Sequence, residues 1–211
     1  MKTTTTMTTI TSISHPLEID SVSPGPGMGR IGITFCPGKC DPNGMTGSWE
    51  RDLDLDLDAV KTWGASAVVT LLEDWELEHL GVQAIGREVI RRKMSWFQLP
   101  IAEGEIPDRA FEEAWQEAGL ELRSILHSGG DVVVHCRGGL GRAGMIASRL
   151  LIELGMNPGT AMAEVREARM GAIETDEQAL YVLGIRPVPK PRQASKTHPA
   201  PKSRPAPKSQ T

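Results

Sequence analysis

The amino-acid sequence predicts an α/β protein in which a central, mainly parallel sheet of about four to five strands lies between layers of helices. Short apolar runs rich in β-branched residues alternate with longer segments whose apolar residues recur at helical spacing. One such run, at residues 131–135, leads into a glycine-rich turn and then into a helical pattern from Met145. We therefore expect a strand, a tight loop and a helix in that order, with a ligand site beyond the carboxyl end of the strand.

The elements can be placed in chain order from their apolar patterns and turn residues. We expect strands at residues 30–36, 65–72, 94–101 and 131–135, and helices at residues 49–64, 73–80, 82–93, 106–127, 145–154, 158–170 and 175–183. The segment 37–48 is rich in turn residues and is predicted as a loop.

The segment 49–64 is the ambiguous one, because Leu53, Leu55 and Leu57 alternate as in a strand while the whole segment also fits one helical face. Its length and Ser48 as an N-cap favour a helix. We interpret its aspartates as a solvated face, since the segment lacks the Gly and Glu of a calcium-binding loop.

The two ends of the chain differ in composition from the middle. Residues 1–28 are rich in Thr and Ser and end in Pro and Gly, which predicts a flexible leader. Residues 29–185 have the pattern of one folded domain. Residues 186–211 are rich in Pro and Lys and repeat PAPKS, so we expect a disordered tail that either docks a partner or keeps the protein soluble.

Charge, hydropathy and cysteine usage narrow the class of protein. The last 26 residues hold seven of the 23 Lys and Arg, whereas all 27 Asp and Glu precede them, so the acidic body is not expected to bind nucleic acid. No apolar run is long enough to span a bilayer, and the N-terminal residues do not form a signal peptide. Three cysteines do not describe a disulfide framework, and we expect a cytoplasmic protein.

The residues DVVVHCRGGLGRAG carry the strongest chemical pattern. Five residues separate Cys136 from Arg142, enough for the loop to curl around one tetrahedral oxyanion. The glycines of this loop allow consecutive N–H groups to point inward and form an anion-binding nest at the start of a helix. The Arg142 guanidinium can bind two oxygens of the same anion, and the positive field favours a thiolate at Cys136.

The sequence HCRGGLGRAG resembles the signature loop H-C-x5-R of the cysteine-dependent protein tyrosine and dual-specificity phosphatases, and its interior is most similar to kinase-associated phosphatase and its bacterial relatives. A structural cysteine or a loop of the rhodanese or arsenate-reductase kind is the alternative. The resemblance covers roughly residues 30–185 and implies a three-layer phosphatase fold with Cys136 as the nucleophile. It implies that substrate binds to Arg137, Gly138, Gly139, Leu140, Gly141 and Arg142.

The resemblance also implies a carboxylic acid on a loop after a strand, which protonates the departing ester oxygen. The matching segment reads LPIAEGEIPD, and the position of the acid holds Glu103 in place of the usual Asp. Asp108 is the second candidate, although it is also well placed to cap the following helix. Glu105 is the third.

Three further positions follow from the same resemblance. Gln178 in AIETDEQ matches a residue that holds the water for hydrolysis of the phosphocysteine, and Glu174 stands where relatives often have Gln. His135 is expected to orient the loop, because neighbouring residues on a strand point to opposite faces. Ala143 replaces the hydroxyl residue that helps the sulfur leave, so we expect a slower second step.

Three functions are consistent with these residues. The first is a protein phosphatase that acts on phosphotyrosine alone or also on phosphoserine and phosphothreonine. The second is a phosphatase of inositol phosphates, phosphoinositides or nucleotides, which the positive charge of Arg137 suits. The third is a phosphate-binding module with little turnover. No metal or organic cofactor is implied, and the partner is a phosphorylated protein or a small phosphomonoester.

Overall fold

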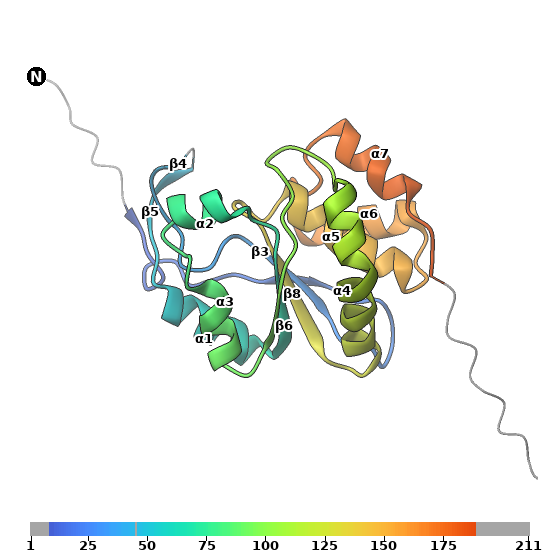
Figure 1. The fold of residues 1–211 in the computed structure, drawn as a ribbon, viewed down its shortest axis with the longest axis horizontal. Helices are drawn as coiled ribbons and strands as arrows, with labels where there is room; N and C mark the ends of the chain where they lie inside the picture. The colour runs from blue at the N-terminus through green and yellow to red at the C-terminus, as the bar shows by residue number, and fades with distance from the viewer. Residues whose placement is uncertain (1–8, 45, 189–211) are drawn as a thin grey trace, which may run out of the picture.

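The structure is a computed structural model, and it describes residues 9–44 and 46–188. Its central sheet has five strands in the order β2-β3-β8-β6-β7, with β2 antiparallel to β3 and all other pairs parallel (Figure 1). The bounds of these strands are Asp20–Val22 (β2), Ile31–Thr34 (β3), Ala65–Thr70 (β6), Ser95–Gln98 (β7) and Asp131–His135 (β8). The predicted α/β fold with a mainly parallel sheet of four to five strands is confirmed.

Two groups of helices cover the two faces of this sheet (Figure 1). One face carries α1 (Leu53–Trp63), α2 (Asp74–His79) and α3 (Ile85–Arg91). The other carries α4 (Arg109–His127), α5 (Gly141–Glu153), α6 (Pro158–Ala168) and α7 (Asp176–Gly184). The seven predicted helices are therefore all present, each shifted by a few residues at its ends.

The central strand β8 shows why the sheet is buried on both sides. Val132 and Val134 pack in the core cluster of α4 to α7, whereas Val133 packs in the cluster of α1 to α3. All three are fully buried, as expected for a parallel strand covered by helices on both faces. Because β8 is the central strand, its carboxyl end and the loop that follows it lie in the middle of the row of strand ends.

The segment predicted as a loop contains a β-hairpin. Strands β4 (Cys40–Gly44) and β5 (Gly47–Glu50) pair antiparallel, and β1 (Thr9–Ile10) adds to β5 to form a second sheet. Ser48 therefore lies in β5 and does not cap α1. The N-cap of α1 is Asp52, whose side chain accepts a hydrogen bond from the Leu55 N–H at 2.9 Å.

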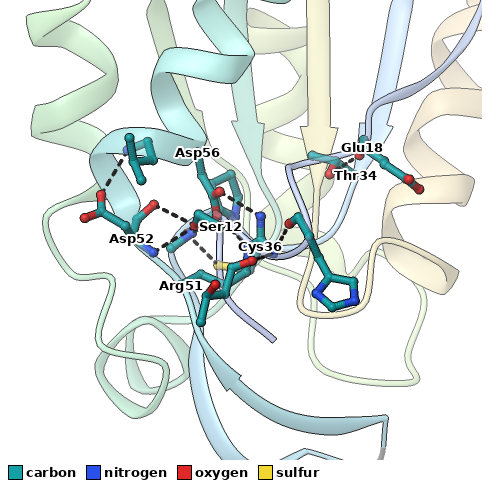
Figure 2. Close-up of polar contacts among 12 residues, drawn as sticks. Ser12, Glu18, Thr34, Cys36, Arg51, Asp52 and Asp56 are labelled. Carbon is teal, nitrogen blue, oxygen red and sulfur yellow. Dashed lines mark hydrogen bonds and ion pairs between the residues drawn. The ribbon is translucent and has the colours of Figure 1, made fainter. Parts of the chain in front are cut away.

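The prediction of a flexible leader is wrong for residues 9–28, which the structure places in contact with the domain; residues 1–8 lie outside the described part. Ser12 Oγ accepts a hydrogen bond from the Asp52 N–H at 2.9 Å, and Thr34 Oγ1 donates to the Glu18 carbonyl at 2.8 Å (Figure 2). Backbone pairing of β1 with β5 and of β2 with β3 adds further contacts. Composition misled here because Thr, Ile and Val, which occur among these residues, favour strands when a partner strand is available.

One aspartate of α1 is buried, against the prediction of a solvated face. Asp56 receives two hydrogen bonds of 2.8 Å from the Arg51 guanidinium and a third of 2.8 Å from the Gly38 N–H (Figure 2). Both charged side chains are almost completely buried. Arg51 also donates to the His15 carbonyl at 2.8 Å, so this ion pair joins the N-terminal segment, the hairpin and α1.

Most of the predicted C-terminal tail, residues 189–211, lies outside the described residues. Within the described part, no helix is both long enough and apolar enough to cross a membrane.

Candidate active site

The loop between β8 and α5 holds Cys136 at the carboxyl end of the strand. The Gly139 N–H donates a hydrogen bond to Cys136 Sγ at 3.2 Å, and the cysteine is 3% exposed. Gly139 has φ of 72°, and a Cβ there would lie 2.4 Å from the backbone oxygen of Thr34. Only glycine can occupy this position, because the loop curls directly over the end of β3.

The carbonyl groups of the loop are held from outside by Arg169, which follows α6. Its guanidinium donates to the Gly139 carbonyl at 2.7 Å and to the Gly138 carbonyl at 3.4 Å, and it pairs with Asp20 of β2 at 2.7 Å. These contacts fix the backbone of the loop at Gly138 and Gly139. The sequence analysis did not find Arg169, because only the folded chain brings it to the loop.

Arg142 is buried and oriented by a carboxylate from α2. Its Nη1 and Nη2 donate to the two oxygens of Glu76 at 2.7 and 2.8 Å, and Nη1 also donates to the Ile101 carbonyl at 2.9 Å. A guanidinium has five N–H donors, and among the residues that the structure describes Nε and one N–H of Nη2 have no partner, so they are available to two oxygens of an anion. Burial lowers the pKa of Arg142, but the hydrogen bonds with Glu76 and the attraction of Cys136, Glu76 and Glu103 together outweigh it and hold that pKa above its usual value.

A cavity of about 360 Å³ lies over this loop. It brings together most of the residues predicted from the sequence, namely Glu103, Cys136, Arg137, Gly138, Leu140, Arg142 and Gln178. It is also lined by residues that the sequence did not assign to the site, namely Lys39, Asp41, Gly44, Thr46, Trp49 and Gly104, and by Glu174. Within residues 9–44 and 46–188, no cluster of three His, Cys, Asp or Glu side chains is arranged to hold a metal ion.

The three candidate acids occupy different places. Glu103 lines the cavity of Cys136, and its carboxylate lies 3.6 Å from Nη1 of Arg137. Asp108 is the N-cap of α4 and accepts a hydrogen bond from the Phe111 N–H at 2.8 Å, so its predicted role as a cap is confirmed. Asp108 and Glu105 line a neighbouring cavity that does not include Cys136. Of the three, Glu103 alone shares a cavity with the thiol.

Glu174 and Gln178 reach the signature loop from the segment before α7 and from its first turn. The Gly141 N–H donates to Oε2 of Glu174 at 2.8 Å, and the Glu174 N–H donates to Oε1 of Gln178 at 2.9 Å. The Gln178 side chain is buried and its Nε2 lies 3.5 Å from the Gly104 carbonyl, on the loop that carries Glu103. The Glu174 carboxylate thus accepts the hydrogen bond of the Gly141 N–H, one of the donors predicted for the anion-binding nest.

His135 lies behind the loop, on the side of β8 opposite to Cys136. Its Nε2 is 2.8 Å from Oγ1 of Thr70, which also accepts a hydrogen bond from Trp96 Nε1 at 2.9 Å. Complete burial lowers the pKa of the imidazole to about 4. His135 is therefore neutral near pH 7 and does not form a pair of metal ligands with Cys136.

The β4–β5 hairpin forms one wall of the cavity. Asp41 of β4 pairs with Arg137 at 2.8 Å, and this contact joins the hairpin to the residue after the cysteine. The hydrogen bond with Asp41 raises the pKa of Arg137. Trp49 of β5 packs edge-on against Phe35, with ring centroids 5.2 Å apart.

A buried thiol at a strand end, an anion nest and an oriented arginine define a cysteine-dependent phosphatase site. Over residues 45–182 the chain matches the family described as "Swiss Army Knife protein, DSP-PTPase phosphatase domain". The chain therefore belongs to the cysteine-dependent protein tyrosine and dual-specificity phosphatase family.

Individual relatives agree with this assignment. Protein tyrosine phosphatase type IVA 3 of Mus musculus is 30% identical over 135 residues, which cover 62% of this chain and 70% of that protein. Cyclin-dependent kinase inhibitor 3 of Rattus norvegicus is 29% identical over 135 residues, covering 63% of this chain and 62% of that protein.

Among solved structures, kinase associated phosphatase with its catalytic-site cysteine replaced by serine superposes with a TM-score of 0.68. It is 26% identical, and the alignment covers 79% of this chain and 92% of that one. Tk-PTP in its active form gives a TM-score of 0.55 at 28% identity, covering 75% and 96% of the two chains. The predicted resemblance to kinase-associated phosphatase and its relatives is confirmed.

Proposed function

We propose that this protein hydrolyses phosphomonoesters through a phosphocysteine intermediate, and that phosphotyrosine of proteins is the first substrate class to test. The observation that carries the proposal is the geometry of one loop. The nucleophile Cys136, Gly138 of the glycine-rich loop and Arg142 all line one cavity, and the Gly139 N–H donates to the Cys136 sulfur. Membership of the phosphatase family supports it.

In the first step the Cys136 thiolate attacks phosphorus, the S–P bond forms and the P–O bond to the leaving group breaks. The loop N–H groups and Arg142 stabilise the negative charge on the phosphoryl oxygens as it develops. Glu103, protonated, donates its proton to the departing oxygen, since an alkoxide is a poor leaving group. Glu103 is proposed for this role because it lies in the cavity of the thiol.

In the second step a water molecule attacks phosphorus and the S–P bond breaks, which releases inorganic phosphate and restores the thiolate. Glu103, now a carboxylate, accepts the proton of the water. Gln178 and Glu174 line the cavity beside the loop, and this supports the proposal that they position this water. Ala143 offers no hydroxyl to the sulfur, so we expect this step to be the slower one.

The test compares Cys136→Ser with Cys40→Ser, a control that makes the same change at an exposed cysteine. Phosphate release is measured with phosphotyrosine, phosphoserine and phosphothreonine peptides and with inositol phosphates. We expect Cys136→Ser to lose turnover and to keep vanadate binding, because the nest and Arg142 remain. Full activity of Cys136→Ser would contradict the thiolate mechanism. Vanadate binding without turnover by the unsubstituted protein would instead support the phosphate-binding module.

A further inference from the structure

Lys39 is a buried cation in the wall of the cavity. It lies between β3 and β4, is only 6% exposed and lines the same cavity as Cys136. Its Nζ lies 3.6 Å from the centroid of the Trp49 ring and 5.3 Å from that of Phe35. Burial lowers the pKa of the ammonium group to about 8, so Lys39 is mostly charged at neutral pH.

The other two cations of the cavity have carboxylate partners. Arg142 is bound by both oxygens of Glu76, and Arg137 is bound by Asp41 at 2.8 Å. Within the described residues, no carboxylate oxygen lies within 4 Å of Nζ of Lys39, and the ammonium group contacts the aromatic rings of Trp49 and Phe35. A buried charge is normally paired or hydrogen-bonded, so the ammonium group of Lys39 has unused capacity for an anion.

We propose that Lys39, held against the ring of Trp49, forms a subsite for a second anionic group of the substrate. The preferred substrates are then compact bisphosphates, in which a second phosphate lies next to the phosphate that Cys136 attacks. This inference rests on the proposed phosphatase function and narrows its substrate class. It does not require any residue of the catalytic step to change its role.

The size of the cavity favours a small molecule. About 360 Å³ is near the lower end of the range for ligand sites, and both Cys136 and Lys39 line this one space. Two anionic groups that reach both residues must therefore lie on one compact skeleton. Trp49 lines the same cavity, and its ring holds the ammonium group of Lys39 at the cavity wall.

The experiment compares kcat/KM for two probes: an inositol bisphosphate with phosphates on neighbouring carbons, and the inositol monophosphate that carries one of them. For the unsubstituted protein we expect the bisphosphate to be preferred by about 10- to 100-fold, the size of one charge-assisted hydrogen bond. Lys39→Met keeps the aliphatic stem over Trp49 and should reduce this ratio to about one. Lys39→Arg keeps the charge and should retain most of the preference for the bisphosphate. Lys61→Met, the same change at an exposed residue of α1, should leave the ratio unaltered.

Several outcomes overturn the inference, and they differ from failure of the proposed function. A ratio near one in the unsubstituted protein overturns it even if no Lys39 variant folds. An unaltered ratio in Lys39→Met overturns it as well. If Lys39→Met alters only the preference among phosphotyrosine peptides with and without a neighbouring acid, the residue recognises peptides instead. If no probe is hydrolysed, the proposed function fails, and the binding constants of the two probes, measured by calorimetry, still decide whether Lys39 selects the bisphosphate.

Discussion

The Glu76–Arg142 pair provides the sharpest test of how this site is held, and Glu76→Gln is the change that probes it. Glu76 lies on α2, far from the signature loop in sequence, and its carboxylate is 1% exposed. The glutamine keeps the volume and one carbonyl oxygen, which can still accept the Glu73 N–H as the carboxylate does at 3.1 Å. What it removes is the negative charge and the second acceptor facing Nη1 and Nη2 of Arg142.

The expected effect on stability follows from burial. Removing one partner of a buried ion pair costs about 3–5 kcal/mol, because the remaining charge is left without compensation. The carbonyl of Ile101, 2.9 Å from Nη1, still accepts one hydrogen bond from Arg142. We therefore expect the free energy of unfolding to fall by about 3 kcal/mol, near the lower end of this range. The guanidinium also loses the contact that fixes its plane, so kcat/KM should fall by at least about tenfold, since small misplacements of a catalytic group are costly.

Urea unfolding at pH 7 measures the first effect, and phosphate release from a phosphotyrosine peptide measures the second. The matched control is Glu78→Gln, the same change at an exposed position of the same helix, which should alter neither quantity. The reasoning is refuted if Glu76→Gln unfolds at the same urea concentration as the control. It is also refuted if stability falls while kcat/KM is retained, since Arg142 would then not need Glu76 for its orientation.

Four other changes test single residues of the site. Glu103→Gln should slow esters with poor leaving groups much more than esters with acidic leaving groups, which depart without a proton; equal slowing of both would remove Glu103 as the acid. Ala143→Ser should supply the missing donor to sulfur, worth about 1.5–3 kcal/mol, and so raise steady-state turnover by about 10- to 100-fold with a smaller pre-steady-state burst. No burst in the unsubstituted protein and no gain in the variant would contradict this. Glu174→Gln should tighten vanadate binding severalfold, because it removes a negative charge that competes for the Gly141 N–H; unchanged affinity in titrations would refute it. His135 has a pKa of about 4 in the folded protein and 6.5 when unfolded, so the unfolded chain binds the extra proton as pH falls and stability decreases below about pH 6.5. Urea unfolding should show that the free energy of unfolding falls by about 2 kcal/mol between pH 7 and pH 5. If the imidazole is the source of this change, His135→Gln should not show it.

The sequence predicted the parts of the site that lie on one continuous segment. Residues 131–142 combine a β-branched strand, glycines and two functional side chains, and local patterns of this kind depend little on the rest of the fold. Asp108 as a helix cap was predictable for the same reason. The identity of Glu103 as a cavity residue followed only from the resemblance to phosphatases, since three acids lie close together in that loop.

The residues that the sequence analysis missed depend on long-range contacts. Glu76 reaches Arg142 because β6 lies beside β8, and nothing in the pattern of α2 indicates which of its acids turns inward. Trp49 lies in the β4–β5 hairpin and Lys39 directly precedes it, and the Pro and Gly content of this segment is typical of a loop. Among the described residues, β4 and β5 form a small sheet with β1, separate from the central sheet. Their sequences lack the apolar alternation that would have predicted half-buried strands.

The backbone of the signature loop is held by three separate parts of the chain, and this determines how an anion can enter. The end of β3 packs against Gly139, Arg169 binds the carbonyl oxygens of Gly138 and Gly139, and Glu174 accepts the Gly141 N–H. The first two contacts favour an anion, since they fix the backbone of the loop before any ligand arrives. The third opposes it, because a phosphate that uses the Gly141 N–H must displace a carboxylate of the same sign. The net affinity for phosphate therefore depends on the displacement of the Glu174 carboxylate as well as on the glycine nest. Glu174 lies more than thirty positions away from the loop in sequence.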